Sequence, residues 1–336
     1  MSLLKTEVFF IIFIHMVFRH WIKEHPLAAV ISVGLIIRVI FLVSYLSSAE
    51  WNHLIVDSLY HDRWAMYIAS GNILGDEVYF RAPFYIYLLG GLYAIFGHSL
   101  LIARIFGHVL GLASVVITYH LGSRIFSHRT GIIAACIHAI YPIAIYFESE
   151  LLVEGLFAFL VELSLLFFWK ASTEGRSRDY IFSGIIIGLA AITRPVIMAL
   201  VPLFVLWILI RSGGISRALG KVAIMVGAAG LMIFPITLRN FAVGNDPVLI
   251  SSSGGINFFI GNNEHANGLS ASMPPPLGAR WQISDIKYLA EQETGKRLKP
   301  SQISSHWYNK GLQWITDNKA DFLKPVSYTH LTLPTN

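Results

Sequence analysis

The sequence predicts an all-α membrane protein that crosses the bilayer several times. The chain has 336 residues, of which 55% are hydrophobic and only 13% are charged, whereas a soluble globular domain carries about 25% charged residues. A soluble core of this size cannot bury so much apolar surface. Several apolar runs also approach the roughly 20 residues with which a helix crosses a bilayer. The excess apolar surface is therefore expected to face lipid.

Apolar stretches predict about seven spans within residues 27–239. The fifth and sixth stretches are short and meet at Thr193-Arg194-Pro195, where the proline can end one helix or begin the next. In chain order the predicted spans are residues 27–46, 100–121, 131–147, 151–169, 181–192, 196–210 and 222–238.

Basic residues between the spans predict the orientation. Because positively charged loops stay in the cytoplasm, we expect a cytoplasmic N-terminus in the inner membrane of a bacterium, with the outer loops in the periplasm. The net charge of +5 is explained by this topology, and we expect no nucleic-acid partner. The inner segments contain Lys5, Arg19, Lys23, Arg124, Arg129, Lys170, Arg176, Arg178, Arg211, Arg217 and Lys221, and the short outer loops contain only Arg63, Arg81 and Arg194.

Residues 1–26 are expected to form a cytoplasmic or interfacial segment before the first span. Residues 9–18 are apolar, but Arg19, His20 and Lys23 follow, where small residues would precede a signal-peptide cleavage site. A short hydrophobic anchor is the alternative.

Two long outer loops are predicted. The first covers residues 47–99 and includes an aromatic stretch, 83–96, that is short for a span and fits an interfacial helix. The second covers residues 240–325 and contains three consecutive prolines, which exclude one long helix. The last residues, 326–336, resemble translated sequencing-adapter sequence. We expect them to be non-native and the chain to be cut short, with a natural polar tail as the alternative.

The sequence offers no clear metal site. The single cysteine, Cys136, lies in an apolar run and allows neither an internal disulfide nor a cysteine-based zinc site. The 13 histidines include no HExxH pair. Arg38 and Arg104 lie in or near predicted spans and are expected to snorkel or to pair internally.

The first outer loop contains a candidate general base. If residues 56–65 are helical, then Asp57, Tyr60 and His61 share one face. An acid just outside the membrane can accept a proton or hold a cation. A solvated loop acid is the alternative.

Two arginines beside prolines are candidates for binding phosphate. Arg81 precedes the aromatic stretch in Phe-Arg-Ala-Pro-Phe-Tyr, and Arg194 lies between the fifth and sixth spans. A guanidinium group forms a charge-assisted fork with phosphate oxygens. A snorkelling cation is the alternative for Arg81. For Arg194 the alternatives are a pair with Glu154 and a helical-hairpin cap.

Two glutamates flank the start of the fourth span. Glu150 and Glu154 are four residues apart, so a continuous helix would place them on one face. Because a carboxylate at that depth is costly, we expect Glu154 to have a role or a partner. A structural ion pair is the alternative.

Residues 239–268 are rich in glycine and asparagine. Gly254, Gly255 and Gly261 allow positive φ, and such a loop can cradle phosphate. The alternative is an outer loop with a structural role only. The candidate substrate-contacting residues of this segment are Arg239, Asn257, Asn262 and Asn263.

Taken in order, these segments resemble the GT-C glycosyltransferases, and most of all family 39, which is akin to protein O-mannosyltransferases and aminoarabinose transferases. The resemblance covers about residues 27–324. It implies a GT-C-type multi-span helical bundle with periplasmic loops that carry interfacial helices. By resemblance, Asp57 and Glu154 are catalytic and Arg81 and Arg194 bind the donor phosphate. Ser58 replaces an acid of many relatives, which argues against a two-carboxylate metal site.

The resemblance implies inverting transfer of a sugar from a polyprenyl phosphate to an acceptor hydroxyl on a protein or glycolipid. No cofactor is certain, and a divalent cation stays open. Tyr60, His61 and Glu150 are further substrate candidates. The alternatives are a secondary transporter or lipid-linked-sugar flippase, although no internal repeat is visible, and an O-antigen polymerase or ligase.

Overall fold

The computed structural model describes residues 24–266 and 282–322, and within these ranges it contains helices and no strand. The all-α prediction is therefore confirmed. Nearly all of the predicted N-terminal segment and the whole of the predicted non-native tail, residues 326–336, lie outside the described residues.

The chain divides into two compact units. Among the described residues, the first unit comprises residues 24–73 and 84–232, and the second comprises residues 74–83, 233–266 and 282–322. Residues 74–83 of the predicted first outer loop therefore belong with the C-terminal part of the chain.

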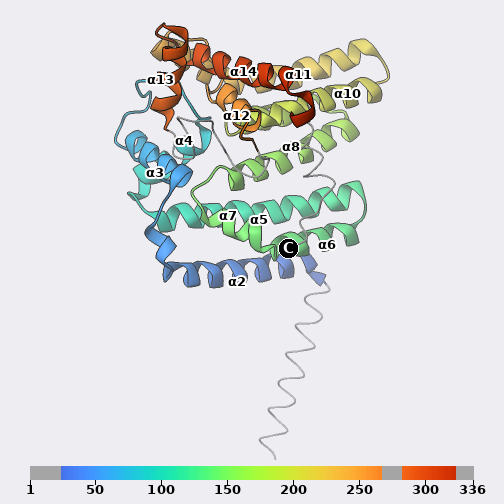
Figure 1. Cartoon of the computed structure of the whole chain (residues 1–336). Coiled ribbons are helices and arrows are strands. Elements are labelled where there is room, and N and C mark those ends of the chain that lie inside the picture. Colours follow the sequence, from blue (N-terminus) through green and yellow to red (C-terminus); the bar gives the residue numbers. More distant parts are fainter. Residues whose placement is uncertain (1–23, 267–281, 323–336) are drawn as a thin grey trace, which may run out of the picture. The chain divides into compact units, whose positions relative to one another are not determined.

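The first unit is built from helices (Figure 1), and residues 70–83 form the long connection between the helices Val56–Ala69 and Phe84–Phe96. The helices are α2 (Pro26–Leu46), the 3-10 helix η1 (Ala49–Asn52), α3 (Val56–Ala69), α4 (Phe84–Phe96), α5 (Leu100–Ile125), α6 (His128–Ala139), α7 (Pro142–Ser149), α8 (Glu154–Glu174), α9 (Ser177–Ala191), the 3-10 helix η2 (Pro195–Leu200), α10 (Val201–Arg211) and the first part of α11 (Ile215–Gly244).

Four described helices, α2, α5, α8 and α11, are long and apolar enough to cross a membrane. The third predicted span is a bent pair, α6 and α7, with a 55° angle between them, which raises the number to five if the pair is one span. The bend falls at Pro142, which lacks a backbone N–H and cannot continue α6. The fifth and sixth predicted spans correspond to α9 and to η2 with α10, which are shorter, so the number seven stays a prediction.

Helix α5 lies at the centre of the N-terminal part of this unit, in contact with α2, α6, α7 and α8 (Figure 1). Small residues let α5 and α6 approach closely: a Cβ atom on Gly122 would lie 2.8 Å from Gly131 Cα. Close backbone contact between small residues is a principal source of attraction between helices in lipid.

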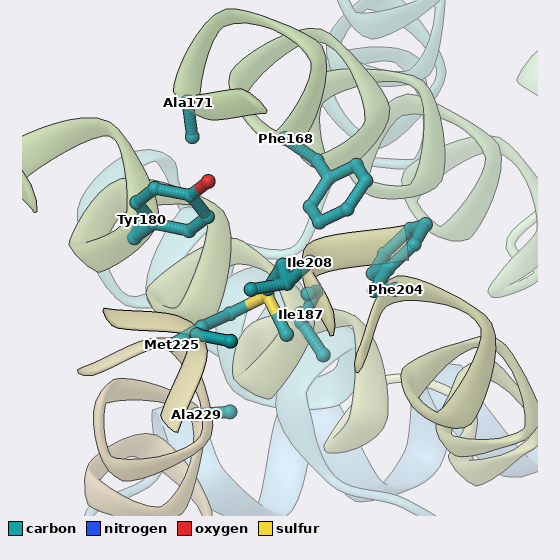
Figure 2. Close-up of a cluster of buried hydrophobic side chains, with 9 residues drawn as sticks. Phe168, Ala171, Tyr180, Ile187, Phe204, Ile208, Met225 and Ala229 are labelled. Atoms are coloured by element: carbon teal, nitrogen blue, oxygen red, sulfur yellow. The ribbon is translucent and has the colours of Figure 1, made fainter. Parts of the chain in front are cut away.

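A second packing centre joins α8, α9, α10 and α11. Phe168 of α8 stacks on Phe204 of α10 with ring centroids 4.2 Å apart (Figure 2). Met225 and Ala229 of α11 complete the cluster with Tyr180 and Ile187 of α9. Side-chain packing therefore holds the short helices α9 and α10 in the first unit.

The second unit contains the end of α11 together with α12 (Gly254–Gly261), α13 (Ile283–Thr294) and α14 (Pro300–Asp317). Its core consists of Ile256, Phe259, Ile286, Ala290 and Trp307. The prediction that one long helix does not fill this region is confirmed.

The glycines of this region have a different role from the predicted one. Gly254, Gly255 and Gly261 all lie in α12, and none is among the described glycines with positive φ. At Gly255 the reason for glycine is space, because a Cβ atom would clash with the Ser304 backbone of α14. The glycine-rich part of the predicted phosphate-cradling loop is therefore helix α12, which packs against α14.

Candidate active site

Helix α3 carries the candidate base, so the helical condition under which Asp57, Tyr60 and His61 share one face is met. Asp57 lies in the first turn and is half-buried. One turn further on, the buried His61 has its Nδ1 atom 2.7 Å from the Leu151 carbonyl oxygen. Because residues four apart share a helix face, the Asp57 side of α3 faces the segment between α7 and α8.

The backbone is strained immediately before Asp57. Val56 has φ of 46° although it is β-branched and 79% exposed. Such conformations cost about 1–3 kcal/mol and cluster at functional sites. The strain fixes how the chain enters α3 and therefore where Asp57 lies.

The two predicted glutamates do not share a helix face, so that prediction is wrong. Glu150 caps the C-terminus of α7, residues 151–153 are not helical, and Glu154 is the first residue of α8. Glu150 accepts a hydrogen bond of 2.8 Å from the Tyr45 hydroxyl group. The position of Glu154 at the start of a span is confirmed, and there the helix dipole favours a negative charge.

Arg194 and Glu154 form an ion pair with a 2.9 Å Nη1–Oε1 distance, and their side chains are 49% and 37% exposed. The second carboxylate oxygen, Oε2, is buried and accepts no hydrogen bond from the described residues. Nearby, the Phe84 backbone N–H donates to the Ile192 carbonyl oxygen at 3.0 Å. This bond joins the start of α4 to the turn that carries Arg194.

Tyr85 is a site residue that the sequence analysis did not select. Its side chain is 6% exposed, and its ring centroid lies 5.5 Å from that of His61. Burial raises the pKa of the Tyr85 hydroxyl group, and the negative charges of Glu154, Glu150 and Asp62 raise it further. Tyr85 is therefore a hydrogen-bond donor at neutral pH. The signal for it was the tyrosine that ends the Arg81 motif.

Arg104 of α5 is a second residue that the sequence analysis set aside. The guanidinium group is buried and donates to the backbone carbonyls of Ser149 and Trp51, at 3.1 Å and 2.8 Å. It also lies 4.0 Å from the centroid of the Trp51 ring. Its Nη1 atom is buried and makes no hydrogen bond within the described part of the chain. The Nη1 group of Arg104 is thus a hydrogen-bond donor without an acceptor among the described residues.

The Asp62 carboxylate is bound by other side chains of the protein. Its Oδ1 atom accepts a 2.6 Å bond from the Tyr93 hydroxyl group and lies 2.9 Å from His98 Nε2. Burial raises the pKa of Tyr93, and the bond to Asp62 raises it further. Asp62 therefore fixes α3 against α4 and the following loop.

Five further candidates lie in the second unit. Arg239 donates to the carbonyls of Leu74 and Glu77 and stacks 3.9 Å from the centroid of the Tyr79 ring. The Asn262 and Asn263 side chains donate to carbonyls at the end of α12, at 2.7 Å and 2.9 Å. These three residues thus hold the backbone in place. Arg81 is half-buried and Asn257 is exposed.

The sequence left open whether a divalent cation binds. Among the described residues, no group of three or more His, Cys, Asp and Glu side chains could hold a metal ion.

The fold and these contacts define an all-α, multi-pass membrane protein with acids, cations and a buried phenol linked by contacts in its first unit. Residues 81–238 match the model of the dolichyl-phosphate-mannose-protein mannosyltransferase family. No curated protein matches the chain. The resemblance predicted from the motifs is thus confirmed over these residues, which include Arg81, Glu154 and Arg194 and begin after Asp57. The match supports a membrane glycosyltransferase that uses a lipid-linked sugar donor.

Proposed function

We propose that the protein transfers a sugar, a hexose of the mannose type, from a polyprenyl-phosphate donor to a hydroxyl group at the outer face of the membrane. The acceptor is a protein or a glycolipid such as lipid A or another envelope glycan. The family match over residues 81–238 supports the donor class.

One observation carries the site assignment: residues from four separated motifs are linked by contacts within the first unit. His61 of α3 meets the ring of Tyr85 of α4 and the carbonyl oxygen that precedes α8. Glu154 of α8 meets Arg194, whose turn is bound to the start of α4. Such convergence is expected of an active site and not of independent snorkelling cations.

In the proposed reaction, Asp57 takes the proton of the acceptor hydroxyl group. The acceptor oxygen then forms a bond to the anomeric carbon, and the carbon–oxygen bond to the lipid phosphate breaks with inversion. The electron pair of the broken bond leaves on the phosphate. A phosphate leaving group needs fixed positive charge and hydrogen-bond donors.

We assign that stabilisation to three side chains of the first unit. Arg194, positioned by Glu154, carries the charge proposed from its motif, and Arg104 has a buried Nη1 donor that no described residue accepts from. Arg81, in the second unit, keeps the phosphate-binding role proposed from its own motif. Tyr85 adds a hydroxyl group that stays protonated, so it can donate to a phosphate oxygen. Glu154 is the second proposed catalytic acid, and its Oε2 atom accepts no hydrogen bond from the described residues.

The test is transfer by the purified protein in proteoliposomes that contain a radiolabelled polyprenyl-phosphate mannose. Asp57→Asn keeps the size of the side chain and removes the base, so we expect transfer to fall by about 10²–10⁴-fold. Asp317→Asn, at an exposed position at the end of α14, is the matched control. Transfer near the wild-type rate in Asp57→Asn would place the base elsewhere. Movement of the donor across the bilayer without release of lipid phosphate would indicate a flippase.

A further inference from the structure

A carboxyl group lies deep inside the helical bundle, away from the candidate active site. Glu162 is the ninth residue of α8, a helix long and apolar enough to cross the membrane. At a rise of about 1.5 Å per residue, it lies roughly 12 Å from one end of the helix and roughly 18 Å from the other. An ionisable residue at such a depth is costly and is usually functional.

Glu162 belongs to a chain of hydrogen-bonding groups from three helices. Thr118 of α5 donates to Glu162 Oε2 at 3.4 Å, and its hydroxyl oxygen lies 2.8 Å from His138 Nδ1 of α6. His138 Nδ1 is also 3.9 Å from Glu162 Oε1. Because a hydroxyl group can donate and accept at once, the chain can carry a proton at the imidazole end or at the carboxyl end.

The surroundings of Glu162 provide no fixed cation. Within residues 24–266 and 282–322, no arginine or lysine forms an ion pair with it. Its other polar neighbour is Ser114 of α5. Glu148 of α7 and Arg38 of α2 act on His138, but their charges are paired with each other. A carboxylate here would have only neutral or titratable partners, and its charge would be poorly compensated.

We propose that Glu162, Thr118 and His138 form an intramembrane proton-binding site that holds one exchangeable proton. The ligand is the proton itself. The side chains of Glu162 and His138 are 24% and 19% exposed, so neither is fully enclosed by the described residues. The site is separate from the proposed transfer reaction and does not depend on it.

The test is labelling with a hydrophobic carbodiimide, dicyclohexylcarbodiimide, in proteoliposomes. A protonated carboxyl group adds to this reagent: its proton goes to nitrogen, its oxygen bonds to the central carbon, and rearrangement gives a stable N-acylurea. The product carries the mass of one whole reagent molecule. We expect peptide mass spectrometry to find the adduct on Glu162, with labelling that decreases as the pH rises between about 5 and 8, the range in which histidine titrates.

Glu148 is the internal control. It lies in the same bundle and is more deeply buried, but both of its carboxylate oxygens accept hydrogen bonds from Arg38. We expect no adduct on Glu148 at any of these pH values. An adduct on Glu148 equal to that on Glu162, or none on Glu162, would overturn the proposal.

Two variants test the chain of groups. Thr118→Val keeps the shape and removes the donor to Oε2, and His138→Phe removes the imidazole. Each change removes stabilisation of the ionised carboxylate, so each should move the midpoint of Glu162 labelling to higher pH. Unchanged midpoints in both variants would show that Glu162 holds its proton alone and would overturn the shared site. Glu162→Gln, which should fold like the protonated wild type, must abolish the adduct.

Discussion

Two arginine–glutamate pairs in the first unit have the same chemistry and opposite surroundings. In the Arg38–Glu148 pair the side chains are 1% and 4% exposed, whereas in the Arg194–Glu154 pair they are 49% and 37% exposed. The N–O distances are similar, 2.6 Å and 2.9 Å. The two pairs therefore differ in burial and not in pairing distance, and we propose that only the exposed pair binds a ligand.

The buried pair has no capacity left for a ligand. Arg38 donates to both oxygens of Glu148 and to the carbonyl groups of Gly34 and Ala139. His108 Nδ1 lies 2.9 Å from Glu148 Oε2. A side chain at Gly111 would clash with the Glu148 carboxylate. The exposed pair, by contrast, leaves Glu154 Oε2 without a hydrogen bond from the described residues.

Removal of one partner from the buried pair should have the largest effect on stability. In Arg38→Leu, Glu148 becomes an uncompensated buried charge, and the free energy of unfolding should fall by about 3–5 kcal/mol. Denaturant titration in detergent micelles measures the change. The double variant Arg38→Leu/Glu148→Met should recover most of the loss, because the remaining charge is gone. A loss under about 1 kcal/mol in the single variant would contradict a structural role.

The exposed pair should behave in the opposite way. In Arg194→Ala the free energy of unfolding should change by about 0–1 kcal/mol, as is typical of exposed pairs. Transfer should fall by about 10²–10³-fold, as expected when one preorganised donor to a transition state is removed.

Arg176→Ala is the matched control for this experiment. Arg176 forms an exposed 2.8 Å pair with Glu174 at the other end of α8. Its removal should leave transfer unchanged. Equal rates for both variants would show that Arg194 is only a cap on the turn.

Tyr85 lies next to the exposed pair, and its removal should have a smaller effect than that of Arg194. Tyr85→Phe removes one hydrogen bond to a charged group, which is worth about 1.5–3 kcal/mol, so transfer should fall by about 10–100-fold. Because its pKa is raised in the folded protein, folding favours the protonated phenol. Its contribution to stability should therefore persist up to about pH 10, the ordinary tyrosine value, and decrease above it. A pH series of unfolding measurements on both proteins checks this: Tyr85→Phe should lose less stability above that pH than the wild type.

The comparison also shows how far the sequence could lead. The all-α membrane fold follows from composition and from the lengths of the apolar runs, whereas the helical structure of α3 was only the condition under which its candidate residues would share a face. A break between α7 and α8 was predicted at residues 148–150, but the structure places it at residues 150–153. Glu148, which the predicted spans leave in that short outer connection, is buried, because its partner Arg38 lies 110 residues away in the sequence.

The site was predicted only in part. Glu154 and Arg194 were selected from local motifs, and their pairing was one of the alternatives considered. Tyr85 and Arg104 were not selected, because their position depends on which helices pack together. Arg239, Asn262 and Asn263 were predicted to contact substrate because of their hydrogen-bond donors. In the structure these donors bind backbone carbonyls. Arginine and asparagine side chains can bind either a substrate or the protein backbone. Only the three-dimensional contacts show which of the two they bind.

The smallest effect is expected at a third pair, which lies in the second unit. Lys310 Nζ is 2.8 Å from Glu293 Oε1, and His306 Nε2 is 3.0 Å from Oε2, with side chains between 17% and 43% exposed. Partial burial tends to raise the pKa of Glu293, but the bonds and charges of Lys310 and His306 outweigh it and leave the pKa below the ordinary value of 4.5. Folding therefore favours the ionised carboxylate.

The contribution of Glu293 to the free energy of unfolding is thus fully present above pH 4.5. It disappears as the pH falls through the lower pKa of Glu293 in the folded protein. Because the pair is exposed, it should be worth only about 0.2–1 kcal/mol. In Glu293→Gln the free energy of unfolding should fall by this amount at pH 7, and the difference from the wild type should vanish in strong acid. Lys310 stays above the Trp307 ring, 5.0 Å from its centroid, so the packing of α14 should be unaffected. A loss as large as that expected for Arg38→Leu would show that exposure does not set the energy of these pairs, and the distinction between the two arginine–glutamate pairs would fail with it.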